Sequence, residues 1–397
     1  MSPTARLLLT TRGLRAFGDG FVALLLPVYL KALGYEALQI GFIVTATLLG
    51  SAVLTLAVGF ATRRLSSRQM LLMASGLMLA TGLGFAFARD FWPLLLIGAV
   101  GTLNPSGGDV SPFLPLEQAM LSHAGPDSGR TALFARFGLT GSLMVALGAL
   151  AFGGAHALGA QLGLGGLDIA RLLFVLYGLI GVAVFFLYRR LPVQEPASQA
   201  AATPLGPSRN RVLKLAALFS LDSFGGGFLV QSLLALWLFQ TWHLSIALAS
   251  GFFFWSAVLA AFSQLAAARL AARIGLVRTM VVTHIPANLA LIAAAFAPSL
   301  PIALGLLLIR AFLSQMDVPA RTSYVMAIVT PPERAAAASL TNVPRSLASA
   351  LSPSLAGLLL TLSPFAWPLV IGGALKITYD LLLLAQFRNV RPPEEQP

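Results

Sequence analysis

The sequence predicts an all-α integral membrane protein with twelve transmembrane helices, arranged as two six-helix bundles in parallel repeat. Three observations support this fold class: the composition, the spacing of long apolar runs and an internal repeat. Of the 397 residues, 57% are hydrophobic and 10% are charged, and the mean hydropathy is +0.84. Soluble domains average roughly 45–50% apolar and about 25% charged residues. The composition therefore excludes an ordinary water-soluble protein.

Twelve apolar segments are long enough to cross a bilayer, which takes ~20 residues in a helix. They lie near 13–33, 38–61, 70–88, 91–121, 131–154, 169–188, 212–238, 244–268, 278–297, 299–329, 334–361 and 365–387. The segments 91–121 and 299–329 are long for a single span and contain proline, so we expect both to bend.

Basic residues predict the orientation of these spans. The net charge is +12, and most basic residues lie in short clusters between apolar runs. With a cytoplasmic N-terminus, seventeen Lys and Arg fall in inside loops and tails, against three (Lys31, Arg89 and Arg171) outside. This bias predicts a multi-pass protein of the plasma membrane, the inner membrane of a bacterial cell, with both termini cytoplasmic. Residues 1–11 lack the small-residue cleavage site of a removable signal peptide.

Several function classes are not supported by the residues present. The chain has no cysteine, and its four histidines lack the spacing of metal ligands, so we expect neither a metal nor a cofactor. No Gly-x-x-x-x-Gly-Lys phosphate loop occurs, and no nucleophile–base arrangement suggests an enzyme. We expect a small-molecule substrate and the lipid bilayer as partners, no nucleic acid, and a monomer.

The middle of the chain predicts the domain boundary. The longest connector between spans is polar and rich in Pro, Ala, Ser and Gln, which is typical of a flexible tether. We expect an N-terminal six-helix bundle at 1–188, a cytoplasmic linker at 189–211, and a C-terminal six-helix bundle with a short tail at 212–397.

The two halves repeat in sequence. Three blocks match in order: 15–21 (RAFGDGF) with 222–228 (DSFGGGF), 59–71 with 268–280, and 117–121 with 321–325. The offsets are 207, 209 and 204 residues, so the blocks stay nearly in register. Parallel repeats of six helices recur in transporters, with the binding site near the bilayer midplane.

With twelve spans, cytoplasmic termini, a central loop and basic loops after spans two and eight, the chain resembles the major facilitator superfamily over nearly its whole length. The family's loop signature, Gly-x-x-x-Asp-Arg-x-Gly-Arg-Arg/Lys, is degenerate here. Gly59, Arg64 and Arg68 fit the first copy, but Arg63 replaces the acid. In the second copy Arg273, Gly275 and Arg278 fit, and Ala272 stands where an acid would be. The Gly-Pro signature of drug–proton antiporters is absent from span five. The resemblance implies transport by alternating access.

Charged residues inside the spans are costly, so each is a functional hypothesis. Three pairs are spaced i,i+4 and could be neutralised within one helix: Arg15 with Asp19, Asp317 with Arg321, and Lys376 with Asp380. The resemblance makes span twelve peripheral, so Lys376 and Asp380 are weak candidates. The charges without such a partner are Glu117, Arg136, Asp222 and Arg345.

Two interpretations of these charges remain open. In the first, arginines bind the carboxylate or phosphate of a solute, with Arg310, Arg345, Arg321 and Arg15 as substrate contacts. In the second, ion pairs close an inner gate. The predicted gate residues are Glu117, Arg136, Asp317, Arg64 and Arg273, with Glu117–Arg136 as the favoured pair.

Proton coupling requires a carboxylate that can titrate, and Asp19, Glu117 and Asp222 are the candidates. Asp222 precedes Gly225–Gly227, where the helix could unwind or simply pack closely against a neighbour. The stretch 104–112 in span four predicts an insertion or a helix break. Asp109 there could line a site or cap the resumed helix.

The sequence thus predicts a proton-coupled secondary transporter of a small polar, anionic or zwitterionic solute. One alternative is a drug or toxic-compound exporter of the same superfamily, in which apolar side chains such as Met144, Phe252, Phe253 and Met326 would dominate binding. Another is a membrane sensor or scaffold that has kept the fold without the transport cycle.

Overall fold

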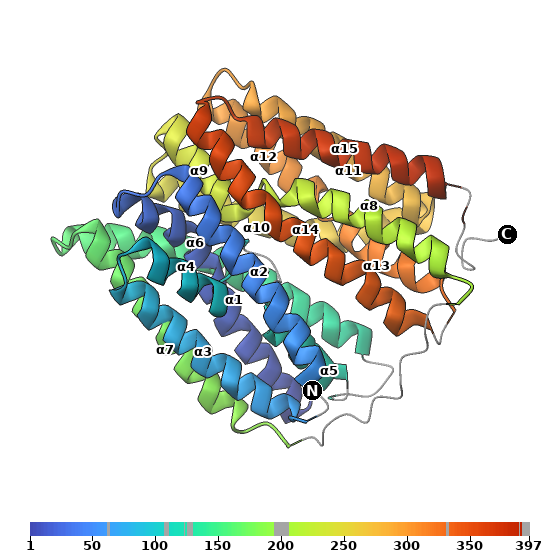
Figure 1. The fold of residues 1–397 in the computed structure, drawn as a ribbon, viewed down its shortest axis with the longest axis horizontal. Helices are drawn as coiled ribbons and strands as arrows, with labels where there is room; N and C mark the ends of the chain where they lie inside the picture. Colours follow the sequence, from blue (N-terminus) through green and yellow to red (C-terminus); the bar gives the residue numbers. More distant parts are fainter. Residues whose placement is uncertain are drawn as a thin grey trace. The chain divides into compact units, whose positions relative to one another are not determined.

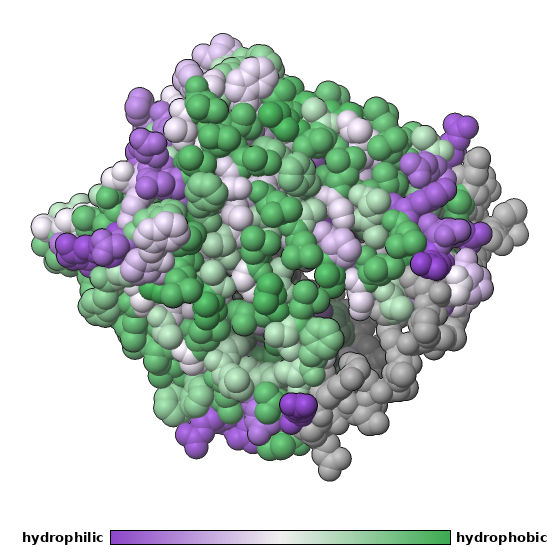
Figure 2. Space-filling model, in the orientation of Figure 1, coloured by the Kyte–Doolittle hydropathy of each residue, from purple (hydrophilic) through white to green (hydrophobic). Residues whose placement is uncertain are grey.

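The computed structural model describes residues 1–61, 64–106, 111–122, 124, 130–193, 206–330, 333–388 and 390. All regular secondary structure in these ranges is helical (Figure 1). Eleven of the described helices are long and apolar enough to cross a membrane, and the shorter apolar helix α4 (Phe91–Val100) belongs to a further span. Figure 2 shows hydrophobic side chains over much of the helical surface, as contact with lipid requires. The predicted all-α, twelve-span architecture is confirmed.

The contacts within the chain divide it into two compact units. The first comprises Met1–Ser198 and Val230–Phe254, and the second comprises Gln199–Leu229 and Trp255–Pro397. The division falls inside helix α10 (Ile246–Ile274). The bundle boundaries inferred from the sequence stay a prediction.

The first unit is built around α1 (Pro3–Ala32), which packs against α6 and α7. Its other helices are α2 (Ala37–Ala61), α3 (Ser67–Phe87), α4, α5 (Phe113–Ser122), α6 (Arg130–Gln161), α7 (Gly166–Tyr188) and α9 (Gln231–Trp242). Glycines allow α1 and α6 to approach closely. A Cβ on Gly20 would lie 2.2 Å from the Val145 carbonyl oxygen, and a Cβ on Gly148 would lie 2.2 Å from that of Phe17.

Span four is broken between α4 and α5, as the stretch 104–112 predicted. The backbone N–H and C=O groups that the break leaves without helical partners form hydrogen bonds with neighbouring helices, as a membrane interior requires. The Thr102 amide donates to Thr81 Oγ1 (3.2 Å), and Tyr177 Oη donates to the Thr102 carbonyl (2.9 Å). Ser232 donates to the Pro105 carbonyl from both its amide (3.1 Å) and its hydroxyl (2.7 Å). Helices α3, α7 and α9 therefore hold the break in place.

The second unit places α8 (Arg209–Gly227) against α14 (Arg334–Leu362) and α15 (Trp367–Phe387). Helix α11 (Leu276–Ala295) packs against α15, α12 (Leu300–Leu313) and α13 (Asp317–Ala327). Span ten consists of α12 and α13, with the predicted bend at residues 314–316.

The glycines of α8 both pack closely and precede a helix break. A Cβ on Gly225 would lie 3.0 Å from the Gly372 carbonyl of α15, and one on Gly227 would lie 2.2 Å from the Ser349 carbonyl of α14. The helix ends at Gly227, and α9 begins at Gln231. Both structural alternatives for these glycines are therefore present: the helices meet at the glycines, and the chain leaves the helical path directly after them.

Candidate functional site

Arg15 and Glu117 form the central ion pair of the first unit. The Arg15 guanidinium contacts the Glu117 carboxylate, and both side chains are almost fully buried, at 2% and 0% exposure. The carboxylate also accepts hydrogen bonds from Tyr188 Oη (2.6 Å) and Thr11 Oγ1 (3.0 Å). The guanidinium lies over the Phe113 ring, 4.3 Å from its centroid. Helices α1, α5 and α7 thus jointly neutralise two charges that would be costly alone in a membrane.

Asp19 lies one turn from Arg15 on α1 and is buried. Its carboxylate is hydrogen-bonded by Asn104, from the break in span four. The structure places no cation within ion-pair distance of Asp19 among the described residues, so the predicted i,i+4 pair with Arg15 is not formed. The reason is geometric: the Arg15 side chain extends to α5 and Glu117.

Asp222 is the centre of a larger charge cluster in the second unit. Lys376 Nζ donates to its Oδ1 (2.6 Å), and Arg321 Nη1 donates to its Oδ2 (3.2 Å). His284 Nε2 lies 3.8 Å from Oδ1. The same Arg321 nitrogen lies 3.2 Å from Asp317 Oδ2, which realises the predicted i,i+4 pair. Helices α8, α11, α13 and α15 converge on this one carboxylate.

His284 connects this cluster to a second acid. Its Nδ1 lies 3.0 Å and 3.1 Å from the two carboxylate oxygens of Asp380, and both residues are buried. Asp380 therefore pairs with His284 of α11, while Lys376 pairs with Asp222 of α8. The expected pair between Lys376 and Asp380 is wrong, because each side chain contacts a different helix.

Arg345 lies beside the Asp222 cluster without joining its ion pairs. Its Nε donates to Ser223 Oγ (3.0 Å), and Ser223 follows Asp222 on α8. The Arg345 side chain is only half-buried, and no carboxylate lies within ion-pair distance among the described residues. This guanidinium can therefore bind a further acceptor.

Arg310 has no partner at all in the part of the chain that the structure describes. Its Nε is buried and makes no hydrogen bond, and no ion pair compensates its charge there. It lies ten residues into α12. At 1.5 Å per residue this is ~15 Å, about half the thickness of a bilayer core.

The other predicted site residues lie apart from both clusters. Arg136 is exposed, and its Nη1 lies 3.7 Å from Met1 Sδ, so the favoured gate pair Glu117–Arg136 is not formed and Glu117 binds Arg15 instead. Arg64 and Arg273 are exposed near the ends of α2 and α10. Their gate roles stay predictions, as do those of Glu117 and Asp317. Arg63 and Asp109 lie outside the described residues.

Sequence reasoning missed the hydroxyl groups and the histidine. Thr11 and Tyr188 bind Glu117, and His284 joins two carboxylates, but only the fold brings these helices together. One signal was available for His284: an ionisable residue in the middle of an apolar span is a functional hypothesis by default.

The fold defines a multi-pass membrane protein with buried charge clusters inside its spans. A family model described as the Major Facilitator Superfamily matches residues 8–228 and 215–397. The chain belongs to the major facilitator superfamily, whose members are transporters and not enzymes.

Individual relatives agree with this assignment. An uncharacterized membrane protein of Saccharomyces cerevisiae is 25% identical over 414 residues, covering 95% of this chain and 92% of the relative. The solved structure of a D-xylose–proton symporter superposes with a TM-score of 0.73 at 15% identity, covering 100% of this chain and 99% of the symporter. A nucleoside transporter structure gives a TM-score of 0.74 at 14% identity, covering 97% and 99%. At these identities the two structures show the fold alone.

Proposed function

We propose that this transporter carries a small anionic or zwitterionic solute by alternating access and couples that movement to protons. The observation that supports the charge of the solute is the state of Arg345 and Arg310. Arg15 and Arg321 are neutralised by neighbouring carboxylates, but neither Arg345 nor Arg310 has an acidic partner among the described residues. A guanidinium binds carboxylate and phosphate oxygens in bidentate fashion.

Arg345 is the stronger candidate of the two. Its Nε is fixed by Ser223, which orients the guanidinium, while half-burial leaves the group accessible. A solute anion at Arg345 would also lie near the Asp222 cluster, because Ser223 is the next residue along α8. Solute binding could thereby alter the pairing of Asp222 with Lys376 and Arg321, since a new anion competes for the same cations.

Arg310 supports the same solute chemistry, and it lies at the depth in the bilayer where transporters of this kind bind their solutes. A guanidinium near the bilayer midplane without a partner is costly on insertion scales, by ~2.5–3.5 kcal/mol. A bound solute anion would offset that cost. Arg321 and Arg15, the other two predicted substrate contacts, already bind Asp222 and Glu117, so they act on the solute only if those pairs open.

The proposal for proton coupling rests on Asp19, Glu117 and Asp222. Glu117 and Asp222 are each held by a cation, whereas Asp19 is held by the neutral Asn104. A proton on Asp19 would remove the charge of a buried carboxylate without leaving a cation unpaired in the same ion pair. Asp19 is therefore the proposed proton carrier, with Glu117 and Asp222 as alternatives.

The solute class is tested by ligand-induced stabilisation of the purified protein. A ligand at a hundred times its Kd stabilises by about 2.7 kcal/mol, which a thermal shift detects. The panel contains carboxylates, phosphate monoesters, amino acids, D-xylose, nucleosides and lipophilic cations. We expect hits among the first three groups that disappear in Arg345→Gln and Arg310→Gln. Arg334→Gln, at the exposed cytoplasmic end of the same helix as Arg345, is the matched control and should keep the shift.

Other results would contradict the proposed solute. A response confined to D-xylose or nucleosides would replace the charged solute by a neutral polar one. A response confined to lipophilic cations would favour the exporter. The absence of a thermal shift with every compound of the panel would contradict solute binding and favour the sensor or scaffold.

Proton coupling is tested in proteoliposomes that enclose a pH-sensitive dye, with the ligand found in the panel. We expect solute addition to drive proton movement in the wild type. Asp19→Asn should abolish proton movement while preserving exchange of labelled for unlabelled solute. Asp90→Asn, an exposed acid in the loop before α4, is the control and should leave both unchanged. Intact proton movement in Asp19→Asn would transfer the role to Glu117 or Asp222.

A further inference from the structure

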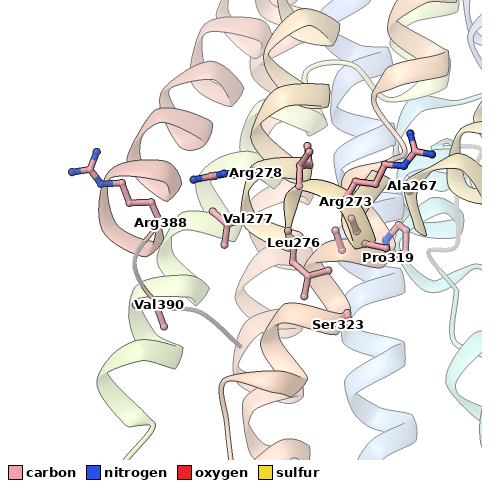
Figure 3. A pocket seen from close by; sticks show the side chains of 14 residues that line it. Ala267, Arg273, Leu276, Val277, Arg278, Pro319, Ser323, Arg388 and Val390 are labelled. Atoms are coloured by element: carbon pink, nitrogen blue, oxygen red, sulfur yellow. The ribbon is translucent and has the colours of Figure 1, made fainter. Parts of the chain in front are cut away.

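A second basic feature lies at the end of the second unit that the charge bias assigns to the cytoplasm. A cavity of about 780 Å³ is lined by the end of α10, the start of α11, one face of α13 and the residues after α15 (Figure 3). Three of its residues are arginines: Arg273, Arg278 and Arg388. Figure 3 shows Arg273 on the α10 side of the cavity, and Arg278 and Arg388 on the side of α11 and α15.

The three arginines are exposed, and none forms an ion pair within the described part of the chain. None of the described residues that line the cavity is acidic. Three positive charges around one concave surface attract an anion, because their fields add where the cavity is open. The remaining lining is largely apolar and includes Ala271, Ile274, Leu276, Val277 and Pro319. The cavity thus combines cations with aliphatic side chains.

Exposed apolar side chains on α11 and α15 lead towards two of these arginines, Arg278 and Arg388. On α11, Val282 and Leu289 are 58% and 54% exposed, and they follow Arg278 by four and eleven residues. These spacings place all three on one face of the helix. On α15, Leu381 is 54% exposed and precedes Arg388 by seven residues, again on one face. Helices α11 and α15 pack against each other.

We infer that this cavity binds the headgroup of an anionic phospholipid from the inner leaflet. The phosphate would contact Arg278 and Arg388, and Arg273, on the opposite side of the cavity, would add to the positive charge that attracts the headgroup. The acyl chains would follow the exposed rows of α11 and α15. Basic pockets between cytoplasmic ends of transmembrane helices have the chemistry that such headgroups require.

A lipid fits the cavity better than the other candidate anions. A free phosphate would use the arginines but not the apolar rows that lead away from them. The chain's own residues 391–397 follow Val390 of the cavity and contain Glu394 and Glu395, but they also contain Arg391. Their charge therefore complements three arginines less well than a phospholipid does.

The test compares lipid binding by three forms of the full-length protein in neutral detergent, using native mass spectrometry and thermal shift. The probe is phosphatidylglycerol, with phosphatidylcholine as the uncharged reference. The triple variant Arg273→Gln, Arg278→Gln and Arg388→Gln should lose preferential binding of phosphatidylglycerol. We expect affinity to fall about five-fold for each arginine removed, which corresponds to about 1 kcal/mol per arginine.

The matched control removes three equally exposed charges from the same unit: Arg209→Gln, Arg211→Gln and Lys214→Gln at the start of α8. This variant should keep the preference for phosphatidylglycerol. Equal loss in both triple variants would overturn the proposal, because the attraction would then be a property of total charge.

Two further experiments distinguish a phospholipid from free phosphate and from the chain's own acidic residues. Inorganic phosphate that stabilises the wild type as strongly as phosphatidylglycerol would overturn the lipid proposal in favour of a phosphate site. A form lacking residues 391–397 should bind phosphatidylglycerol as the wild type does. Lipid binding that appears only after this deletion would show that the chain's own acidic segment occupies the cavity.

Discussion

Asp222 and Arg321 repeat the Arg15–Glu117 ion pair with the two charges exchanged. Asp222 stands at the position of Arg15 in the repeat, and Arg321 stands at the position of Glu117. Both pairs are buried and join the first span of a unit to its fourth. The repeat has therefore kept the contact and reversed its polarity. We therefore predict that an ion pair between these two helices stabilises each unit, whichever helix carries the cation.

This relationship predicts that the Arg15–Glu117 pair can be inverted. Arg15→Leu or Glu117→Leu should each destabilise the protein by about 3–5 kcal/mol, because one buried charge is left without a partner. The double variant Arg15→Glu with Glu117→Arg should recover a large part of this loss. Tyr188 and Thr11 limit the recovery, because their hydroxyls now donate to Glu117 and would have to accept from an arginine. Unfolding in detergent micelles measures all three variants.

The exposed pair Arg171–Asp168 is the control for this experiment. Its nitrogen–oxygen distance is 3.4 Å, but both side chains reach solvent. Arg171→Leu should therefore change stability by no more than about 1 kcal/mol. A double inversion that is no more stable than either single variant would contradict the interpretation of the repeat.

The sequence predicted the fold well but the pairing of charges only in part. Hydropathy, loop charge and repeat register depend on positions along the chain, so they gave the spans and the correspondence between Asp222 and Arg15. Spacing along one helix found the Asp317–Arg321 pair but wrongly joined Lys376 to Asp380. A long side chain can reach a neighbouring helix as easily as its own next turn, and only the packing decides which.

A second prediction concerns the close approach of α1 and α6. Gly148→Ala should destabilise the protein by roughly 1–3 kcal/mol, because the new Cβ would lie 2.2 Å from the Phe17 carbonyl and the helices must separate. Gly154→Ala on the same helix is the control, since nothing lies within 4 Å of its Cβ. That change should be neutral or stabilise by up to about 1 kcal/mol, because alanine favours a helix. Equal effects at both positions, measured by unfolding in micelles, would show that the helix contact does not limit this site.

A third prediction concerns the break in span four. Tyr177→Phe removes the hydroxyl that donates to the Thr102 carbonyl and leaves that carbonyl without this donor inside the membrane. We expect a loss of about 1–3 kcal/mol. Tyr35→Phe is the control, because it also removes a hydroxyl that donates to a backbone carbonyl, in this case that of Arg89. The Arg89 carbonyl lies in an exposed loop, where water can replace the lost donor. This substitution should cost less than about 0.5 kcal/mol. A larger loss from Tyr35→Phe than from Tyr177→Phe would contradict the role of side chains in holding the break.

The last prediction concerns pH and the turn between α13 and α14. Glu333 accepts hydrogen bonds from Ser208 Oγ (2.7 Å), Thr330 Oγ1 (2.7 Å) and the Gly206 amide (2.5 Å). These donors, led by Ser208, lower the pKa of Glu333 from 4.5 to about 2. Because the folded pKa is the lower one, the stabilisation is complete above pH ~4.5 and is lost as the pH falls towards 2.

Glu333→Gln should therefore be less stable than the wild type at pH 7, and the difference should shrink between pH 5 and pH 3. Thermal unfolding at several pH values measures this, with the exposed Glu36→Gln as the control that shows no such convergence. A stability difference that stays constant from pH 7 to pH 3 would mean that the ionised carboxylate does not hold this turn.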